Sequence, residues 1–130
     1  MAQQPIELIL MRELAELLAT PIFVVDGAGS LVFYNEPAEG LLGRRFEETG
    51  PMPAEEWSTV FGPFDADGRP MAPTELPLVI ALREGHAAHE TFAIRGYDGT
   101  VRSLEATAIP LIDARGQLVG AAALFWESVS

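Results

Sequence analysis

The chain contains no cysteine and no lysine. Without cysteine it forms no disulfide, holds no metal through a thiolate and uses no thiol nucleophile. No apolar run approaches the roughly 20 residues that cross a bilayer as a helix. The N-terminus lacks the basic segment and the small-residue cleavage site of a secretion signal. We therefore expect a cytoplasmic protein that does not depend on thiol chemistry.

Positive charge is scarce. Eight basic residues, all of them arginine, stand against 19 acidic ones, and the formal net charge is −11. Proteins that bind nucleic acid need a basic surface to displace counterions from phosphates, and anionic membranes attract the same charge. We therefore expect neither nucleic acid nor membrane as a partner.

Catalytic motifs are also lacking. The sequence contains no G-x-S-x-G, no H-E-x-x-H and no phosphate-binding loop. Its acidic residues are scattered through turn-like segments, whereas a catalytic acid or base must lie within reach of a substrate in a cleft. We predict that the protein is not an enzyme.

The chain is rich in turn signals. Short strings of aspartate and glycine occur at 26–29, 65–68, 98–99 and 113–116, and three of them separate apolar, β-prone runs. Aspartate and glycine tolerate the positive φ angles of tight hairpins, so these strings predict turns between strands. The predicted strands cover residues 22–25, 31–34, 89–96, 101–110 and 117–126.

Helical periodicity occupies the rest of the chain. Residues 6–18 predict an N-terminal helix that ends before Pro21, because the residue preceding a proline is pushed out of the α region. Further helices are predicted over 36–42, 54–61 and 74–84. The order predicts an α+β fold: a five-stranded antiparallel sheet with a helical insert between strands two and three. We divide the chain into a flanking helix (1–19), one domain (20–127) and a tail (128–130).

Four segments resemble the PAS domain family. Residues 22–35 resemble its entry hairpin, whose second strand runs into an asparagine, and residues 35–43 its N-x-A-A-E-x-L-L-G stretch. Residues 94–102 resemble its R-x-x-D-G-x-x-R hairpin, and residues 110–120 its P-L-x-D-x-x-G-x-x-x-G pattern. They stand in the family's order and cover nearly the whole chain. The resemblance implies a sensory and protein-interaction module in signal transduction.

Residues that match the family's motifs are expected to be structural. An asparagine between a strand and a helix can bond the backbone groups that are freed there, and glycine permits tight turns. The structural candidates are Asn35, Gly43, Gly99 and Gly116.

The cofactors that the resemblance implies do not suit these residues. The flavin adduct known in the family needs a reactive cysteine, which the chain lacks. Haem-binding members take an axial histidine from the long helix, and residues 74–84 contain none. His86 and His89 follow as an H-x-x-H pair beside Glu90, a spacing that can hold a metal, but histidines in a polar segment are more often solvated. We expect no cofactor and no metal.

Small side chains on the last strands leave space beneath the helical insert. Apolar pockets of this kind take small apolar ligands, and the alternative is a dry, close-packed core. The candidate pocket residues are Phe33, Leu42, Leu78, Leu82, Leu104, Ala106, Ala108 and Ala122.

The apolar stripe of residues 6–18 is wide enough to touch both its own sheet and a second copy. We expect this helix to cover Phe92 and Ile94, with two copies meeting there. The interface candidates are Leu8, Met11, Leu18, Phe92 and Ile94. The predicted function is a PAS-like module that acts as a homodimer, with a small apolar molecule and a signalling protein as further partners. The alternatives are a ligand-free dimerisation scaffold and a small enzyme based on carboxylates or on the two histidines.

Overall fold

A five-stranded antiparallel sheet forms the centre of the protein. The computed structural model describes residues 5–60, 62–96 and 99–128. Its strands lie in the order β2-β1-β5-β4-β3. The first strand of the chain, β1, therefore pairs with the last, β5, at the centre of the sheet. The predicted fold class is confirmed, and the strand bounds are β1 (Ile22–Asp26), β2 (Leu31–Tyr34), β3 (Ala88–Arg95), β4 (Val101–Ile112) and β5 (Leu118–Glu127).

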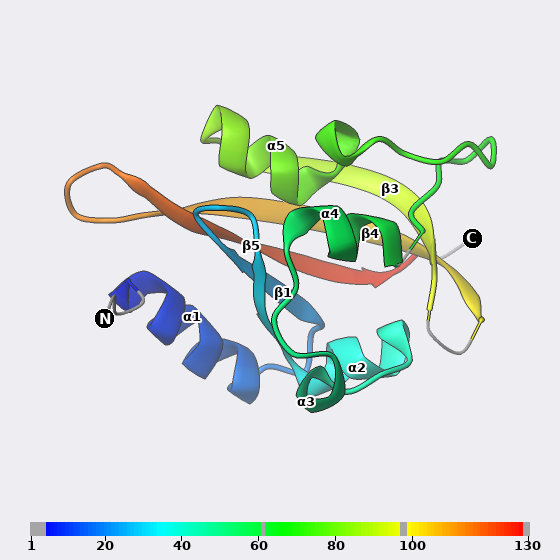
Figure 1. Ribbon diagram of the computed structural model, residues 1–130, viewed down its shortest axis with the longest axis horizontal. Coiled ribbons are helices and arrows are strands. Elements are labelled where there is room, and N and C mark those ends of the chain that lie inside the picture. Colours follow the sequence, from blue (N-terminus) through cyan, green and yellow to red (C-terminus); the bar gives the residue numbers. More distant parts are fainter. Residues whose placement is uncertain (1–4, 61, 97–98, 129–130) are drawn as a thin grey trace.

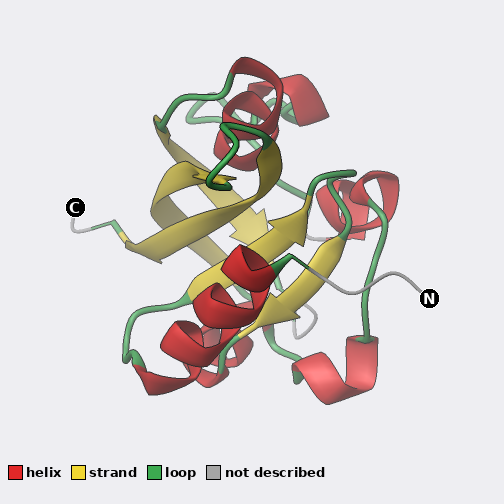
Figure 2. Cartoon of the chain, turned by 90° about the vertical axis from the view of Figure 1, so that its left-hand side faces the viewer, coloured by secondary structure: helices red, strands yellow, loops and turns green. Residues whose placement is uncertain are grey.

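Helices cover both faces of this sheet (Figure 1). One face carries α1, which lies across the front of the strands in Figure 2, and Phe46 of α3 also packs against the core on this face. The segments between β2 and β3 pack mainly on the other face, where α5 contacts β3, β4 and β5. The bounds are α1 (Ile6–Leu17), α2 (Glu36–Leu42), α3 (Phe46–Thr49), α4 (Ala54–Val60), the 3₁₀ turn η1 (Pro73–Glu75) and α5 (Pro77–Glu84).

The two faces have separate cores. Leu8 and Ala15 of α1 are buried against Ile22, Val24 and other apolar residues on one face. The larger core on the opposite face joins the sheet to α2, α4 and α5. A domain of this size can therefore bury both faces of its sheet.

The position of α1 corrects one expectation. The helix does not cover Phe92 or Ile94, because β3 and β4 pair with Phe92 opposite Leu104, and directly paired residues lie on the same face. Phe92 and Ile94 therefore belong to the core beneath α5. The remaining interface candidates, Leu8, Met11 and Leu18, face the protein's own sheet.

The helical insert differs from its prediction at two places. Residues 46–49, which no predicted element covers, form α3. The helix expected over 74–84 is divided, because Pro77 holds Leu76 in an extended conformation with ψ 139°. Pro77 is then the first residue of α5, where its missing N–H has no partner to lose.

The ends of α2 are fixed by its flanking residues. The Oδ1 atom of Asn35 accepts a hydrogen bond from the Ala38 amide, which caps the N-terminus. Gly43 ends the helix with φ 83°, a left-handed conformation that favours glycine. Gly99 and Gly116 also have positive φ, each in a turn between strands. Asp98 lies outside the described residues.

Candidate ligand-binding site

An apolar cavity of about 80 Å³ lies between the helical insert and the sheet. The sheet contributes large side chains from β1, β3 and β5, while Ala106 and Ala123 leave the space open. Above them lie the end of α2, the middle of α4 and the start of α5. The lining residues are Phe23, Leu42, Trp57, Ser58, Pro63, Leu76, Pro77, Leu78, Phe92, Ile94, Leu104, Ala106, Ala123 and Phe125.

Contacts among aromatic side chains fix one wall of the cavity. The rings of Phe23 and Trp57 meet edge to face, with 5.4 Å between centroids, and Phe23 stacks on Tyr34 at 5.9 Å. The indole N–H of Trp57 donates to the carbonyl oxygen of Gly29 at 2.8 Å. Because its donor is satisfied by the protein, Trp57 presents only apolar surface to the cavity.

The predicted pocket residues fall into three groups. Leu42, Leu78, Leu104 and Ala106 line the cavity. Leu82 and Ala108 belong to the surrounding core and do not line it. Phe33 and Ala122 lie on the opposite face, in the core beneath α1, where strand alternation directs them away from the cavity.

Sequence reasoning missed several lining residues, of which Phe92 and Ile94 are the clearest. Their position follows from the length of the β3–β4 connection, which places Arg95 opposite Val101. Counting back from that pair puts Phe92 opposite Leu104. The signal was present in the sequence, but it required the hairpin register.

An open groove of about 460 Å³ adjoins the cavity. It lies where residues 63–71 run beside β3, and Phe64 exchanges two backbone hydrogen bonds of 2.9 Å with Ala93. Its lining residues are Ser58, Thr59, Gly62, Pro63, Phe64, Gly68, Pro70, Met71, Pro73 and Arg95.

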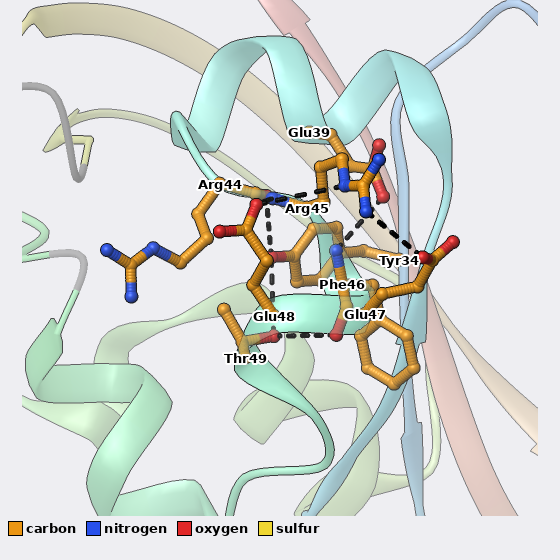
Figure 3. A network of polar contacts seen from close by, with 8 residues as sticks. All are labelled: Tyr34, Glu39, Arg44, Arg45, Phe46, Glu47, Glu48 and Thr49. Atoms are coloured by element: carbon orange, nitrogen blue, oxygen red, sulfur yellow. Dashed lines mark hydrogen bonds and ion pairs between the residues drawn. The ribbon is translucent and has the colours of Figure 1, made fainter.

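A polar network holds the connection between α2 and α3, next to the Leu42 end of the cavity (Figure 3). The Tyr34 hydroxyl donates to the Arg44 carbonyl oxygen at 2.8 Å, and a Glu39 carboxylate oxygen accepts from the Phe46 amide at 3.0 Å. Arg45 forms exposed ion pairs with two carboxylates of α3, the nearer of them 3.2 Å away. The network supports the cavity wall without lining it.

The two histidines do not form a common site. His86 contacts a Glu84 carboxylate oxygen at 3.0 Å and the Ala87 carbonyl oxygen at 2.9 Å. His89 instead contacts the Thr107 hydroxyl at 2.7 Å. The described residues contain no cluster of three or more histidine, aspartate or glutamate side chains placed to hold a metal ion. The hydrogen bond to the Ala87 carbonyl, and then that to Glu84, raises the pKa of His86 above 6.5.

Comparison with known proteins decides the fold. No protein-family model and no curated protein matches the chain. Among solved structures, the PAS domain of BvgS from Bordetella pertussis has 18% identity, with 95% of this chain and 87% of that chain covered and a TM-score of 0.64. The chain has a PAS-like fold.

Light-oxygen-voltage (LOV) proteins share this PAS-like fold. The LOV protein of Rhodobacter sphaeroides is 12% identical, with 96% of this chain and 69% of that chain covered and a TM-score of 0.73. The light-state dimer of the fungal blue-light photoreceptor Vivid is 13% identical, with 84% and 78% covered and a TM-score of 0.65. No helix in the described ranges has the length and apolar character needed to cross a membrane.

The cavity is smaller than a typical site for a ligand of flavin size. Sites for ligands of that size span about 300–1,000 Å³, whereas this cavity has about 80 Å³. Among the described residues that line it, only Ser58 and Trp57 carry a polar side-chain group, and the Trp57 indole N–H is bonded to the Gly29 carbonyl oxygen. The chain also lacks the cysteine for an adduct.

Proposed function

We propose that the protein is a PAS-type sensory and interaction module that detects a small, largely apolar molecule and carries out no catalysis. The observation that carries this proposal is the apolar cavity of about 80 Å³ beneath α5. For comparison, an apolar protein cavity of about 150 Å³ stays dry and takes up benzene or xenon. The cavity therefore suits a short alkyl group or a molecule of similar size.

A ligand in this cavity would contact the helical insert and the sheet together. Leu78 and Pro77 of α5 form one side, and Phe92 and Phe125 of the sheet form the other. A ligand shifts a conformational equilibrium by the difference of its affinity for the two states. Filling the cavity favours the arrangement in which α5 is held on the sheet, and this is the signal that the module would transmit.

Xenon provides a direct test of the cavity, because it needs no polar partner. We expect xenon to shift the amide NMR signals of cavity residues such as Leu104 and Phe125. An Ala106→Leu substitution fills the space and should abolish these shifts. Ala114→Leu adds the same bulk to an exposed turn and should leave them unchanged. Absence of shifts in the unsubstituted protein would contradict the proposal. In a second experiment, native mass spectrometry of protein purified from its own host would show whether a small molecule stays bound.

We propose that the module acts as a homodimer through the outer face of α1. Ile6, Leu10, Leu14 and Leu17 follow one another at helical spacing and are 48–84% exposed. The inner face of α1 is anchored on the sheet, so this stripe is held rigidly towards solvent. In a two-fold dimer the same patch of each copy contacts the other, so one apolar stripe per copy is enough to form the interface. Vivid, which shares the fold, is described as a light-state dimer.

A further inference from the structure

The apolar cavity and the adjoining groove are parts of one site. Ser58 and Pro63 line both of them. The cavity is apolar on almost all sides, whereas the residues that line the groove include Arg95 and Thr59. A molecule that occupies both spaces must therefore be apolar at one end and polar at the other.

Ser58 places a hydroxyl group at the junction of the cavity and the groove. The residue is only 8% exposed, and no hydrogen bond to its hydroxyl is present in the described part of the chain. Its neighbour behaves differently, because the Thr59 hydroxyl donates to the Glu55 carbonyl oxygen at 2.7 Å. The Ser58 hydroxyl can therefore form a hydrogen bond with a polar ligand atom at the junction.

Among the described residues, Arg95 is the only charged one that lines the groove. Across the described ranges it forms no ion pair, and its one hydrogen bond, from Nη1 to the Gly99 carbonyl oxygen, is long at 3.5 Å. Four of the other seven arginines, Arg12, Arg45, Arg69 and Arg102, have a carboxylate oxygen between 3.2 and 3.9 Å away, and none of these four lines the groove. In a chain with a net charge of −11, an arginine without a carboxylate partner is available to an anion from solution.

We infer that the ligand is a short-chain amphipathic carboxylate. Its alkyl end fills the cavity, its polar end passes Ser58, and its carboxylate binds Arg95. A single guanidinium matches one carboxylate in charge and in fork geometry. This inference rests on the proposed role of the cavity and adds the chemical class of the molecule that it takes.

Calorimetric titration with two matched series tests the inference. The first series is the straight-chain carboxylates from butanoate to octanoate, and the second is the alcohols of the same chain lengths. Arg95→Gln should weaken carboxylate binding about 5- to 10-fold and leave alcohol binding unchanged. Arg115→Gln, in an exposed turn, is the matched control and should change neither. Added salt should weaken binding of the carboxylates but not of the alcohols.

The outcomes separate this inference from the proposed function. Equal carboxylate affinity in Arg95→Gln and the unsubstituted protein overturns the inference. The inference is also overturned if no carboxylate binds. If xenon still enters the cavity in that case, the proposed function stands without the inference. Failure of xenon, alcohols and carboxylates alike overturns both. Ser58→Ala provides a second readout, because it should weaken both series if the hydroxyl contacts the polar end of the ligand.

Discussion

Asn35 and Ala15 are 20 positions apart, and the Nδ2 atom of Asn35 donates a hydrogen bond of 2.9 Å to the Ala15 carbonyl oxygen. The same amide group donates to the Thr20 carbonyl oxygen at 2.9 Å. Its Oδ1 atom accepts from the amides of Ile22 at 3.0 Å and Ala38 at 3.2 Å. One side chain, 2% exposed, thus joins α1, the start of β1 and the start of α2.

Replacing Asn35 by alanine should lower the free energy of unfolding by about 3 to 5 kcal/mol, because buried backbone donors and acceptors lose their partners. The measurement is urea denaturation followed by circular dichroism. Gln117→Ala, at an exposed position in a turn, is the control and should change stability by less than about 0.5 kcal/mol. A loss for Asn35→Ala no larger than that of the control would show that the hydrogen bonds add little.

Gly120 of β5 lies directly beneath Leu8 of α1. A Cβ atom there would lie 2.7 Å from Leu8 Cδ2 and would collide with the Val25 carbonyl oxygen. We expect Gly120→Ala to destabilise the fold by about 1 to 3 kcal/mol through overpacking and to shift the NMR signals of α1.

Gly40 provides a control of opposite sign for the Gly120 prediction. It lies inside α2, and no atom is within 4 Å of a Cβ atom built there. Gly40→Ala should therefore stabilise the protein, by up to about 1 kcal/mol, because alanine is the better helix former. Destabilisation of equal size by both substitutions would argue against a specific clash at Gly120.

Local features of the sequence were sufficient to predict the strands. The turn at 113–116 and the alternation on either side of it located β4 and β5, whose observed bounds differ from the predicted ones by at most two residues. This works because turn chemistry and strand alternation depend on neighbouring residues. The prediction of one helix over 74–84 was wrong at Leu76, because Pro77 excludes the residue before it from the α conformation.

The faces were harder to predict than the elements. Whether Phe92 faces the cavity depends on its pairing with Leu104, and a register change of one residue reverses every side chain of a strand. Similarly, the helix spanning 6–18 is apolar on two sides, and its sequence alone does not determine which side contacts the sheet. The cavity residues from β3 and the outer stripe of α1 were missed because both depend on tertiary packing.

The raised pKa of His86 predicts a pH dependence. Hydrogen bonds from the ring to the Ala87 carbonyl and to Glu84 favour the protonated form. The resulting stabilisation is fully present below pH 6.5, the ordinary histidine value, and is lost as the pH rises through the higher pKa of the folded state. We expect Glu84→Gln to lower the pKa of His86, measured from imidazole NMR signals. Glu90→Gln, an exposed carboxylate on β3, should have a smaller effect, and an identical titration of His86 in all three proteins would contradict the assignment.

The dimer proposal is best tested on the outer stripe of α1. Deleting residues 1–19 would expose the core beneath the helix, because Leu8 and Ala15 are buried there. Loss of dimers in the deletion variant could then come from loss of the interface or from damage to this core. Leu10→Glu and Leu14→Glu change only side chains that are 55% and 48% exposed. We expect each to weaken self-association at least ~10-fold, since a charge would be buried in an apolar interface. Analytical ultracentrifugation measures the change, and circular dichroism confirms that α1 stays folded.

Ile112→Glu is the matched control for the dimer test, because Ile112 is 48% exposed and lies at the end of β4, outside the α1 stripe. If the stripe is the interface, Ile112→Glu retains the dimer and both α1 variants lose it. Equal weakening by all three would indicate general charge repulsion in a chain whose net charge is already −11. An unchanged dimer in both α1 variants would place the interface elsewhere. The pattern across the three substitutions therefore separates a specific helix–helix contact from an effect of total charge.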